Sequence, residues 1–212
     1  MKIAIQNTAV ILLASGLSRR FGRRDKLMAD LGGRPLMDHA AGVLARLDAQ
    51  TRIAVCPHDR REIGERLHDR FVIAVNKKPK RGLGHSIAAG VHVAMQFKPQ
   101  AIVLAMADMP FIESGMISGL IDHLGAGGAN IAHCGAMDGT RPPTGFDSVC
   151  FEALKALDGD DGAKALLAAG RFRVMGLQAP APLLADVDTA EDLELARRQM
   201  DIRNRYLGPR SS

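Results

Sequence analysis

The stretch LLASGLSRRFGRRDKL, residues 12–27, begins as a hydrophobic strand and continues into a loop rich in glycine and arginine. Gly16 and Gly22 allow the backbone to approach a bulky anion without a Cβ atom in the way. Backbone N–H groups of such a loop can surround phosphate oxygens, while Arg20 and Lys26 neutralise their charge. We therefore interpret this stretch as a phosphate-binding loop that follows a buried strand.

Hydrophobic runs of strand length recur along the first half of the chain and alternate with helical patterns. Each run is nearly continuous in apolar residues, as expected for strands buried on both faces of a parallel sheet. The runs cover residues 9–14, 52–56, 71–75 and 101–107, and the helical patterns cover roughly 36–47, 59–68, 85–97 and 113–124. This alternation predicts an α/β fold with a mostly parallel sheet, in which ligands bind beyond the carboxyl ends of the strands.

The order of elements changes beyond residue 125. Residues 131–134 predict a strand, and DGTRPPTG, residues 138–145, predicts a connection rich in proline and glycine. The expected elements that follow are helices near 149–157 and 161–169, a strand over 172–178 and a last helix from residue 190. We expect one domain over residues 1–200 and a flexible tail over residues 201–212.

The composition favours a small anionic ligand over nucleic acid. The 212 residues are 47% apolar and carry a net charge of +5, which suits one domain with a sizeable core. Aromatic residues that could stack on bases are scarce, and the basic residues gather in two loop clusters rather than along a stripe. The clusters are Arg19, Arg20, Arg23, Arg24 and Lys26, then Lys77, Lys78, Lys80 and Arg81. Solvated surface charge is the alternative interpretation of each cluster.

The cysteines and the start of the chain indicate a cytoplasmic protein without a membrane partner. Cys56, Cys134 and Cys150 lie far apart, so we expect neither a disulfide framework nor a structural zinc site. The apolar run near the start is short and interrupted by polar residues 6–8, which predicts a strand rather than a signal peptide or membrane span.

Two familiar phosphate-binding motifs are excluded by spacing. A Walker A loop requires GxxxxGK[ST], whereas five residues separate Gly16 from Gly22, and Arg23 follows. The dinucleotide-binding pattern GxGxxG is absent after the first strand, and GLGHSI, residues 82–87, has Ile87 in place of the third glycine.

Six segments, in the same order, resemble the MobA-like NTP transferase family. The opening stretch is similar to its LAAGxSxRFGxxK loop. The other segments are LGGRPLMDHA (31–40), GLGHSIAAGV (82–91), AMADMPFI (105–112), GDDGAKALL (159–167) and DVDTAEDL (186–193). Among them, GDDGAKALL resembles the molybdenum cofactor cytidylyltransferase branch of the family.

The resemblance implies a single-domain, three-layer sandwich with a mostly parallel, Rossmann-like sheet, the nucleotide-diphospho-sugar transferase fold. It implies transfer of a nucleoside monophosphate from an NTP, here CTP, to a phosphate-bearing acceptor of the molybdopterin type, with release of pyrophosphate. Mg²⁺ is the implied cofactor, with Mn²⁺ as a substitute. A molybdenum hydroxylase is the implied partner that receives the product.

The resemblance also assigns roles to matched residues. Arg20, Lys26 and Asp108 are the expected catalytic residues, and Asp108 and Asp188 the expected metal ligands. The expected nucleotide-binding residues are Leu13, Ala14, Ser15, Gly16, Ser18, Arg20, Lys26, Gly84 and Ser86. Arg141 and Pro143 are expected to bind the acceptor.

For both Asp108 and Asp188, a role at the start of a helix is the alternative to metal binding. Asp108 follows a buried strand, where a carboxylate is costly unless it is solvated, paired or bound to a cation such as Mg²⁺. It could instead cap a helix, since Pro110 lies near the first turn. Asp188 could serve the start of the last helix, where Thr189 and Asp192 have the spacing of a capping box.

Two departures from the family pattern leave alternatives open. Ser15 stands where the cytidylyl branch has Ala and the guanylyl branch has Gly, and Pro142 stands where the cytidylyl branch often has His or Asn. The alternatives are a guanylyltransferase on the same acceptor, or a sugar- or alditol-phosphate nucleotidyltransferase. A nucleotide-dependent chaperone that delivers the cofactor is the non-enzymatic alternative, and a nucleic-acid binder is the alternative based on charge alone.

Overall fold

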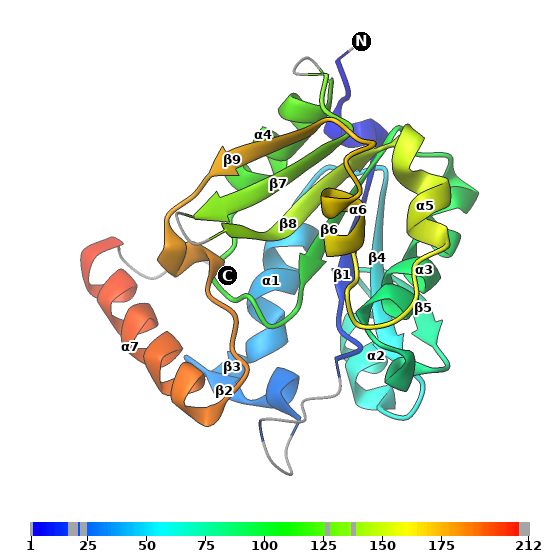
Figure 1. Cartoon of the computed structure of the whole chain (residues 1–212). Helices are drawn as coiled ribbons and strands as arrows, with labels where there is room; N and C mark the ends of the chain where they lie inside the picture. Colours follow the sequence, from blue (N-terminus) through cyan, green and yellow to red (C-terminus); the bar gives the residue numbers. More distant parts are fainter. Residues whose placement is uncertain (1, 17–20, 22–24, 126–127, 137–138, 208–212) are drawn as a thin grey trace.

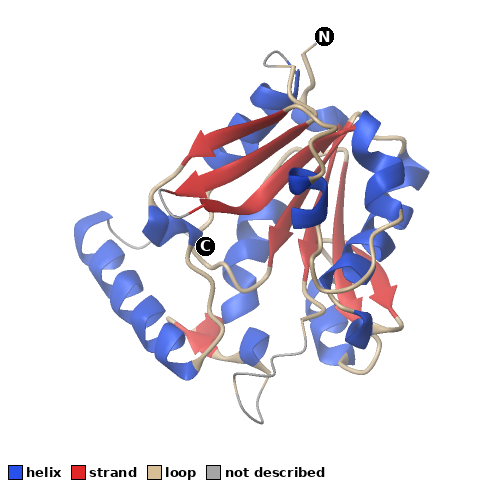
Figure 2. Ribbon diagram, in the orientation of Figure 1, coloured by secondary structure: helices blue, strands red, loops and turns tan. Residues whose placement is uncertain are grey.

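Seven strands form one sheet in the computed structural model, which describes residues 2–16, 21, 25–125, 128–136 and 139–207 (Figure 1, Figure 2). The strands lie in the order β5-β4-β1-β6-β8-β7-β9. Their bounds are β1 Thr8–Leu13, β4 Thr51–Pro57, β5 Val72–Asn76, β6 Ala101–Met106, β7 Ile131–Ala136, β8 Gly139–Asp147 and β9 Val174–Gln178. A separate two-stranded ribbon pairs β2 (Asp30–Leu31) with β3 (Arg34–Pro35).

The sheet is mostly parallel, as predicted, with β8 as its antiparallel member. The chain first adds β4 and then β5 on one side of β1, and afterwards returns to place β6 on the other side. The strand order therefore reverses beside β1. In open α/β sheets this reversal creates the crevice that receives ligands at the carboxyl ends of the strands.

Helices cover both faces of the sheet, which confirms the expected three-layer sandwich. Alternate residues of β1 point into two separate cores: Val10 and Leu12 pack with helices α1, α2 and α4, and Ile11 packs with α3 and α5. The helices are α1 Leu36–Ala45, α2 Arg61–Leu67, α3 Leu83–Ala94, α4 Ser114–Gly125, α5 Phe151–Lys155, α6 Lys164–Ala168 and α7 Ala190–Leu207. Short 3₁₀ turns are η1 Ile5–Asn7, η2 Lys26–Met28, η3 Pro79–Arg81, η4 Met95–Phe97, η5 Ser148–Cys150 and η6 Ala181–Leu184.

One sequence-based expectation was wrong, and the expected tail is described in part. Residues 138–145 were expected to be a connection, but residues 139–147 form strand β8. The pairing with β7 passes from His133 opposite Thr144 to Cys134 opposite Arg141, so the consecutive prolines 142–143 fall within an irregularity where the ladder needs no N–H from them. The tail expected from residue 201 is helical as far as Leu207, where α7 ends.

None of the helices in the described ranges is long and apolar enough to cross a membrane.

Gly90 permits the close packing of α3 on the sheet, and this generates a stability prediction. A Cβ atom at this position would lie 2.7 Å from Val55 Cγ2 and 2.9 Å from Ile11 Cγ2. We expect Gly90→Ala to lower the free energy of unfolding by about 1–3 kcal/mol, because the added methyl group overpacks the core. Urea denaturation measures this change.

Gly42 in α1 provides the matched control, because its added Cβ would meet no atom within 4 Å. Gly42→Ala should raise the free energy of unfolding by about 0.4–1 kcal/mol through the lower entropy of the unfolded chain. Equal stability of Gly90→Ala and the wild type would contradict the packing argument.

Candidate active site

The carboxyl ends of β1 and β6 lie side by side at the reversal of strand order. Leu13 is opposite Met106 at the end of their pairing, and the N–H of Ala107 donates to the carbonyl of Leu13 at 3.1 Å. Ser15 and Asp108 therefore emerge from two neighbouring strands at the same edge of the sheet. This is the edge at which the predicted phosphate-binding loop begins.

Lys26 connects two carboxylates at this edge. Its Nζ atom lies 2.7 Å from Asp108 Oδ2 and 2.6 Å from Asp188 Oδ1. Lys26 comes from η2, which follows the loop, and Asp188 comes from the segment before α7. That segment is held by a backbone hydrogen bond in which the N–H of Val187 donates to the carbonyl of Asp108 at 3.0 Å. The structure thus brings together three predicted site residues that are widely separated in the sequence.

The Lys26–Asp108–Asp188 cluster is largely shielded from water. The side chains of Lys26, Asp108 and Asp188 are 7%, 13% and 40% exposed. Burial alone would lower the pKa of Lys26, but the charges and hydrogen bonds of the two aspartates outweigh it and raise that pKa. Burial raises the pKa of Asp108, although the charge of Lys26 opposes this shift. The ammonium therefore acts as the counterion of the two carboxylates.

Asp108 does not cap α4, and Asp188 takes part in the start of α7 through its backbone N–H, which donates to Asp192 Oδ2 at 3.0 Å. Asp108 is not the cap of α4, because that helix begins only at Ser114. At α7, the capping box is formed by Thr189 and Asp192: Asp192 Oδ2 accepts from the N–H of Thr189 at 2.8 Å, and the N–H of Asp192 donates to Thr189 Oγ1 at 3.1 Å. The side chain of Asp188 is therefore directed to Lys26 rather than to the helix end.

The chemistry of these two carboxylates fits a hard divalent cation. Asp108 Oδ1 is buried and accepts no hydrogen bond from the described residues. The described ranges contain no cluster of three or more His, Cys, Asp or Glu side chains that would form a complete protein cage for a metal. Mg²⁺ typically binds one or two carboxylates together with phosphate oxygens and water. Asp108 and Asp188 are therefore suited to a cation that arrives with a phosphorylated ligand.

Both ends of the predicted phosphate-binding loop, Gly16 and Asp25, are bound to Arg60, a residue that sequence reasoning missed. Arg60 Nη2 donates to the carbonyl of Gly16 at 2.6 Å, and its Nη1 donates to Asp25 Oδ2 at 2.6 Å. The predicted residues Ser18 and Arg20 lie outside the described residues. No periodicity or motif singled out Arg60, which is far from the loop in sequence.

A buried hydrogen-bond network joins the starts of the loop and of α3. Ser15 Oγ donates to Ser86 Oγ at 2.7 Å, and Asn76 Nδ2 donates to the same oxygen at 3.0 Å. All three side chains are almost fully buried. Ser15 and Ser86 were predicted from the resemblance, whereas Asn76 was missed. A polar residue at the end of the hydrophobic strand 71–75 was the available signal.

The glycines at the start of α3 allow a second segment to pack closely. A Cβ atom on Gly84 would lie 2.8 Å from the backbone of Asp158, and the N–H of Gly84 already donates to the carbonyl of Gly159 at 2.8 Å. Arg81 forms an ion pair with Asp158 in the same region. Gly84 therefore has a packing role in this structure, and its predicted contact with nucleotide stays a prediction.

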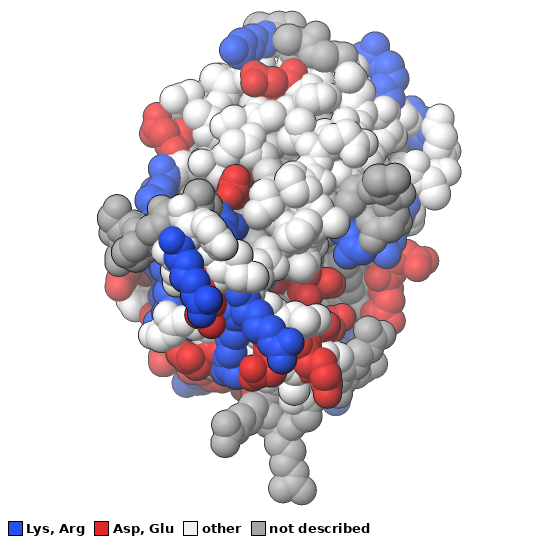
Figure 3. All heavy atoms as spheres, turned by 90° about the vertical axis from the view of Figure 1, so that its left-hand side faces the viewer, with Lys and Arg blue, Asp and Glu red and all other residues white. Residues whose placement is uncertain are grey.

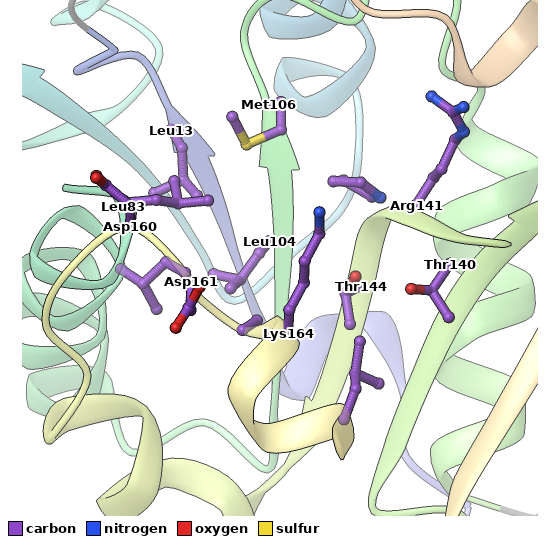
Figure 4. Close-up of a pocket in the computed structure, with 14 residues that line it drawn as sticks. Leu13, Leu83, Leu104, Met106, Thr140, Arg141, Thr144, Asp160, Asp161 and Lys164 are labelled. Atoms are coloured by element: carbon purple, nitrogen blue, oxygen red, sulfur yellow. The ribbon is translucent and has the colours of Figure 1, made fainter. Parts of the chain in front are cut away.

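A pocket of about 200 Å³ opens at the ends of β1 and β6 (Figure 4). Its lining residues come from the ends of β1 and β6, the start of α3, strand β8 and the segment 160–167. They are Leu13, Leu83, Ile87, Leu104, Met106, Thr140, Arg141, Pro142, Thr144, Asp160, Asp161, Ala163, Lys164 and Leu167. Met106 precedes Asp108 by two residues, so their Cα atoms lie within about 7 Å of each other.

One of the two predicted acceptor residues lines the pocket. Arg141 lines it, and Figure 4 shows Lys164 directed into the pocket from α6 toward Met106. Pro143, in contrast, is buried, and Pro142 takes the position at the pocket wall. Lys164 was missed as a candidate, although it lies within the segment GDDGAKALL.

Residues 10–174 match the model of the MobA-like NTP transferase domain. The chain belongs to this family. It is 31% identical over 200 residues to the purine catabolism protein PucB of Bacillus subtilis, covering 90% of this chain and 96% of that protein. The crystal structure of a homolog of Mycobacterium tuberculosis Rv0371c, from Mycobacterium sp. strain JC1, is 27% identical and has a TM-score of 0.77. That match covers 94% of this chain and all (100%) of the other.

A further solved structure, of Rv0371c from Mycobacterium tuberculosis in complex with manganese, has a TM-score of 0.67 at 21% identity. It covers 90% of this chain and 97% of that chain, and at this identity it supports the fold alone. Family membership confirms the predicted nucleotide-diphospho-sugar transferase fold and establishes the chain as a nucleotidyltransferase of the MobA-like family.

The Lys26–Asp108–Asp188 cluster predicts how the loss of Lys26 changes the stability of the protein and its response to Mn²⁺. We expect Lys26→Met to lower the free energy of unfolding by about 3 kcal/mol, because it leaves two carboxylates without their counterion. This value is the lower end of the range for breaking a buried ion pair, since the side chain of Asp188 is 40% exposed. Mn²⁺ should then raise the Tm of Lys26→Met more than that of the wild type, because no ammonium competes for the carboxylates. Thermal unfolding with and without MnCl₂ measures both effects.

Asp108→Asn is the control that weakens the metal site itself, so its Tm should respond less to Mn²⁺ than that of Lys26→Met. An equal Mn²⁺ response in the wild type, Lys26→Met and Asp108→Asn would show that the cation binds elsewhere.

Proposed function

We propose that this MobA-like nucleotidyltransferase transfers cytidine monophosphate from CTP to the phosphate of a molybdopterin-type acceptor and releases pyrophosphate. The observation that carries the proposal is the Lys26–Asp108–Asp188 cluster. In it, two carboxylates suited to a divalent cation and one ammonium lie together after the glycine- and arginine-rich loop, where the strand order reverses.

The reaction needs no covalent intermediate with the protein. An oxygen of the acceptor phosphate attacks the α-phosphorus of the NTP, and the bond from this phosphorus to the bridging oxygen of the leaving pyrophosphate breaks. Asp108 and Asp188 would hold Mg²⁺ or Mn²⁺, which supplies positive charge to the triphosphate. Lys26 stabilises the negative charge that develops on the phosphate oxygens, and the surrounding burial strengthens this interaction.

Ser15 supports CTP as the nucleotide. Its hydroxyl is bonded to Ser86, so the side chain presents its Cβ and backbone to a base much as Ala does in the cytidylyl branch. GTP is the alternative nucleotide, because Ser15 departs from the Ala of the cytidylyl branch as well as from the Gly of the guanylyl branch.

The pocket at the ends of β1 and β6 is the site that we propose for a phosphate-bearing acceptor. Its walls are largely apolar, and its charged lining residues are Arg141, Lys164, Asp160 and Asp161. An acceptor phosphate would bind at Arg141 and Lys164, which Figure 4 shows on the side of the pocket away from Asp160 and Asp161. Part of the wall comes from residues 160–164 within GDDGAKALL, the segment that resembles the molybdenum cofactor cytidylyltransferase branch. We therefore expect this segment to contact the acceptor. A sugar or alditol phosphate is the alternative acceptor.

The distribution of surface charge is relevant to the alternative that the protein binds nucleic acid. On the face that includes α7, Lys and Arg side chains are interspersed with Asp and Glu in the lower part, while the upper part shows few charges (Figure 3). This face lacks the continuous basic stripe that duplex binding uses, as far as the described residues show.

We expect a molybdenum hydroxylase as the recipient of the product, and we expect this transfer to take place in the cytoplasm. Delivery of the cofactor without catalysis is the alternative role of the protein.

Pyrophosphate release with Mg²⁺, purified molybdopterin cofactor and each NTP in turn tests the proposal. We expect release with CTP, and we expect Asp108→Ala to lower the rate by about 10²–10³ while its circular dichroism spectrum stays that of the folded wild type, because an electrostatic contact to the reacting phosphates is lost.

The other outcomes separate the alternatives. Release with GTP alone would move the proposal to the guanylyl branch, and release with a sugar or alditol phosphate in place of molybdopterin would change the acceptor. Binding of nucleotide without release for any acceptor would favour the delivery role. Wild-type turnover by a folded Asp108→Ala variant would refute the metal assignment.

A further inference from the structure

Arg60 lies outside the charged cluster but is fixed to the framework of the sheet. It is the residue before α2 and follows β4, which pairs with β1 from Ala9 to Leu13. Its side chain is 19% exposed, and that of its partner Asp25 is 12% exposed. The guanidinium therefore approaches the phosphate-binding loop from the turn between β4 and α2, which is not part of the loop.

The two nitrogens at the end of Arg60 bind opposite ends of the loop. Nη2 donates to the carbonyl of Gly16, where the chain leaves β1, and Nη1 donates to the carboxylate of Asp25, where the chain enters η2. The planar guanidinium fork allows one side chain to bind both acceptors at once. A lysine at this position would keep the charge but would lack the fork.

Asp25 transmits this contact to Lys26. One carboxylate oxygen of Asp25 accepts from Arg60, and the other accepts from the N–H of Leu27 at 3.0 Å, which caps η2. Lys26 is the first residue of η2, and its ammonium binds Asp108 and Asp188. A chain of described contacts therefore runs from Arg60 to the two candidate metal ligands.

We propose that Arg60 is a positioning residue: it fixes both ends of the loop and thereby sets the position of Lys26. The inference rests on the proposed function in that the loop binds the triphosphate of an NTP. A loop whose ends are already fixed loses fewer conformations when it binds a ligand, so less binding free energy is spent on ordering. A catalytic group whose support is removed is displaced from the reacting atoms.

Arg60→Lys tests the proposal, with Arg66→Lys as the matched control. Arg66 lies in α2, the helix that Arg60 precedes, and it also donates two hydrogen bonds to a carboxylate, that of Asp38, away from the loop. We expect Arg60→Lys to raise the KM for NTP about 10- to 100-fold, with a smaller loss in kcat and with faster hydrogen exchange at the N–H of Leu27. Arg66→Lys should leave the KM for NTP and the Leu27 exchange at their wild-type values.

A double-mutant cycle tests whether Arg60 acts through Asp25. Asp25→Asn should raise the KM for NTP in the same direction, and the double variant should be no worse than Arg60→Lys alone, because both changes break one chain of contacts. Fully multiplicative effects would overturn the link through Asp25.

The outcomes keep the two proposals apart. A wild-type KM and unchanged Leu27 exchange in Arg60→Lys, in an enzyme that turns over NTP, would overturn the positioning role and leave the proposed function intact. If the wild type itself turned over no NTP, the proposed function would fail. The Leu27 exchange would then still decide whether Arg60 holds the end of the loop.

Discussion

The ion cluster of Lys26, Asp108 and Asp188 is the interaction on which the arrangement of the site depends. Taking a carboxylate out of water is costly unless it is paired, and the largely buried Asp108 follows directly on a hydrophobic strand. Lys26 supplies the counterion, and Asp188 completes the contact from the far end of the chain. Three separate segments are thereby joined at one edge of the sheet.

The sheet provides the rigid support for this charged cluster. Strands β1 and β6 are buried on both faces, so their ends are held rigidly and in register. The loop, η2 and the segment before α7 are then attached by specific polar contacts: Arg60 to the loop ends, Asp25 to η2, and the N–H of Val187 to the carbonyl of Asp108. A rigid scaffold with polar attachments is suited to binding a charged ligand whose own charge completes the site.

The sequence was sufficient for features with a local or repeated signal. Continuous apolar runs predicted the parallel strands of the sheet, and the family motifs singled out Lys26, Asp108 and Asp188, which the structure brings together. Strand β8 was missed because its consecutive prolines, which usually interrupt a strand, fall within an irregularity in the pairing with β7. Arg60 was missed because its partners are 35 and 44 positions away, and such contacts follow from strand order rather than from any motif. Asn76 offered a signal, a polar residue at a strand end, but its partner Ser86 was identifiable only once the fold had placed α3 beside it.

The most direct test of the account is a crystal structure with Mn²⁺ and a non-hydrolysable CTP analogue, with the metal located by its anomalous signal. The account predicts Mn²⁺ bound to carboxylate oxygens of both Asp108 and Asp188, with the Lys26 ammonium turned from these carboxylates to the phosphate oxygens. Mn²⁺ located away from both aspartates, with Lys26 still bound between them, would contradict it.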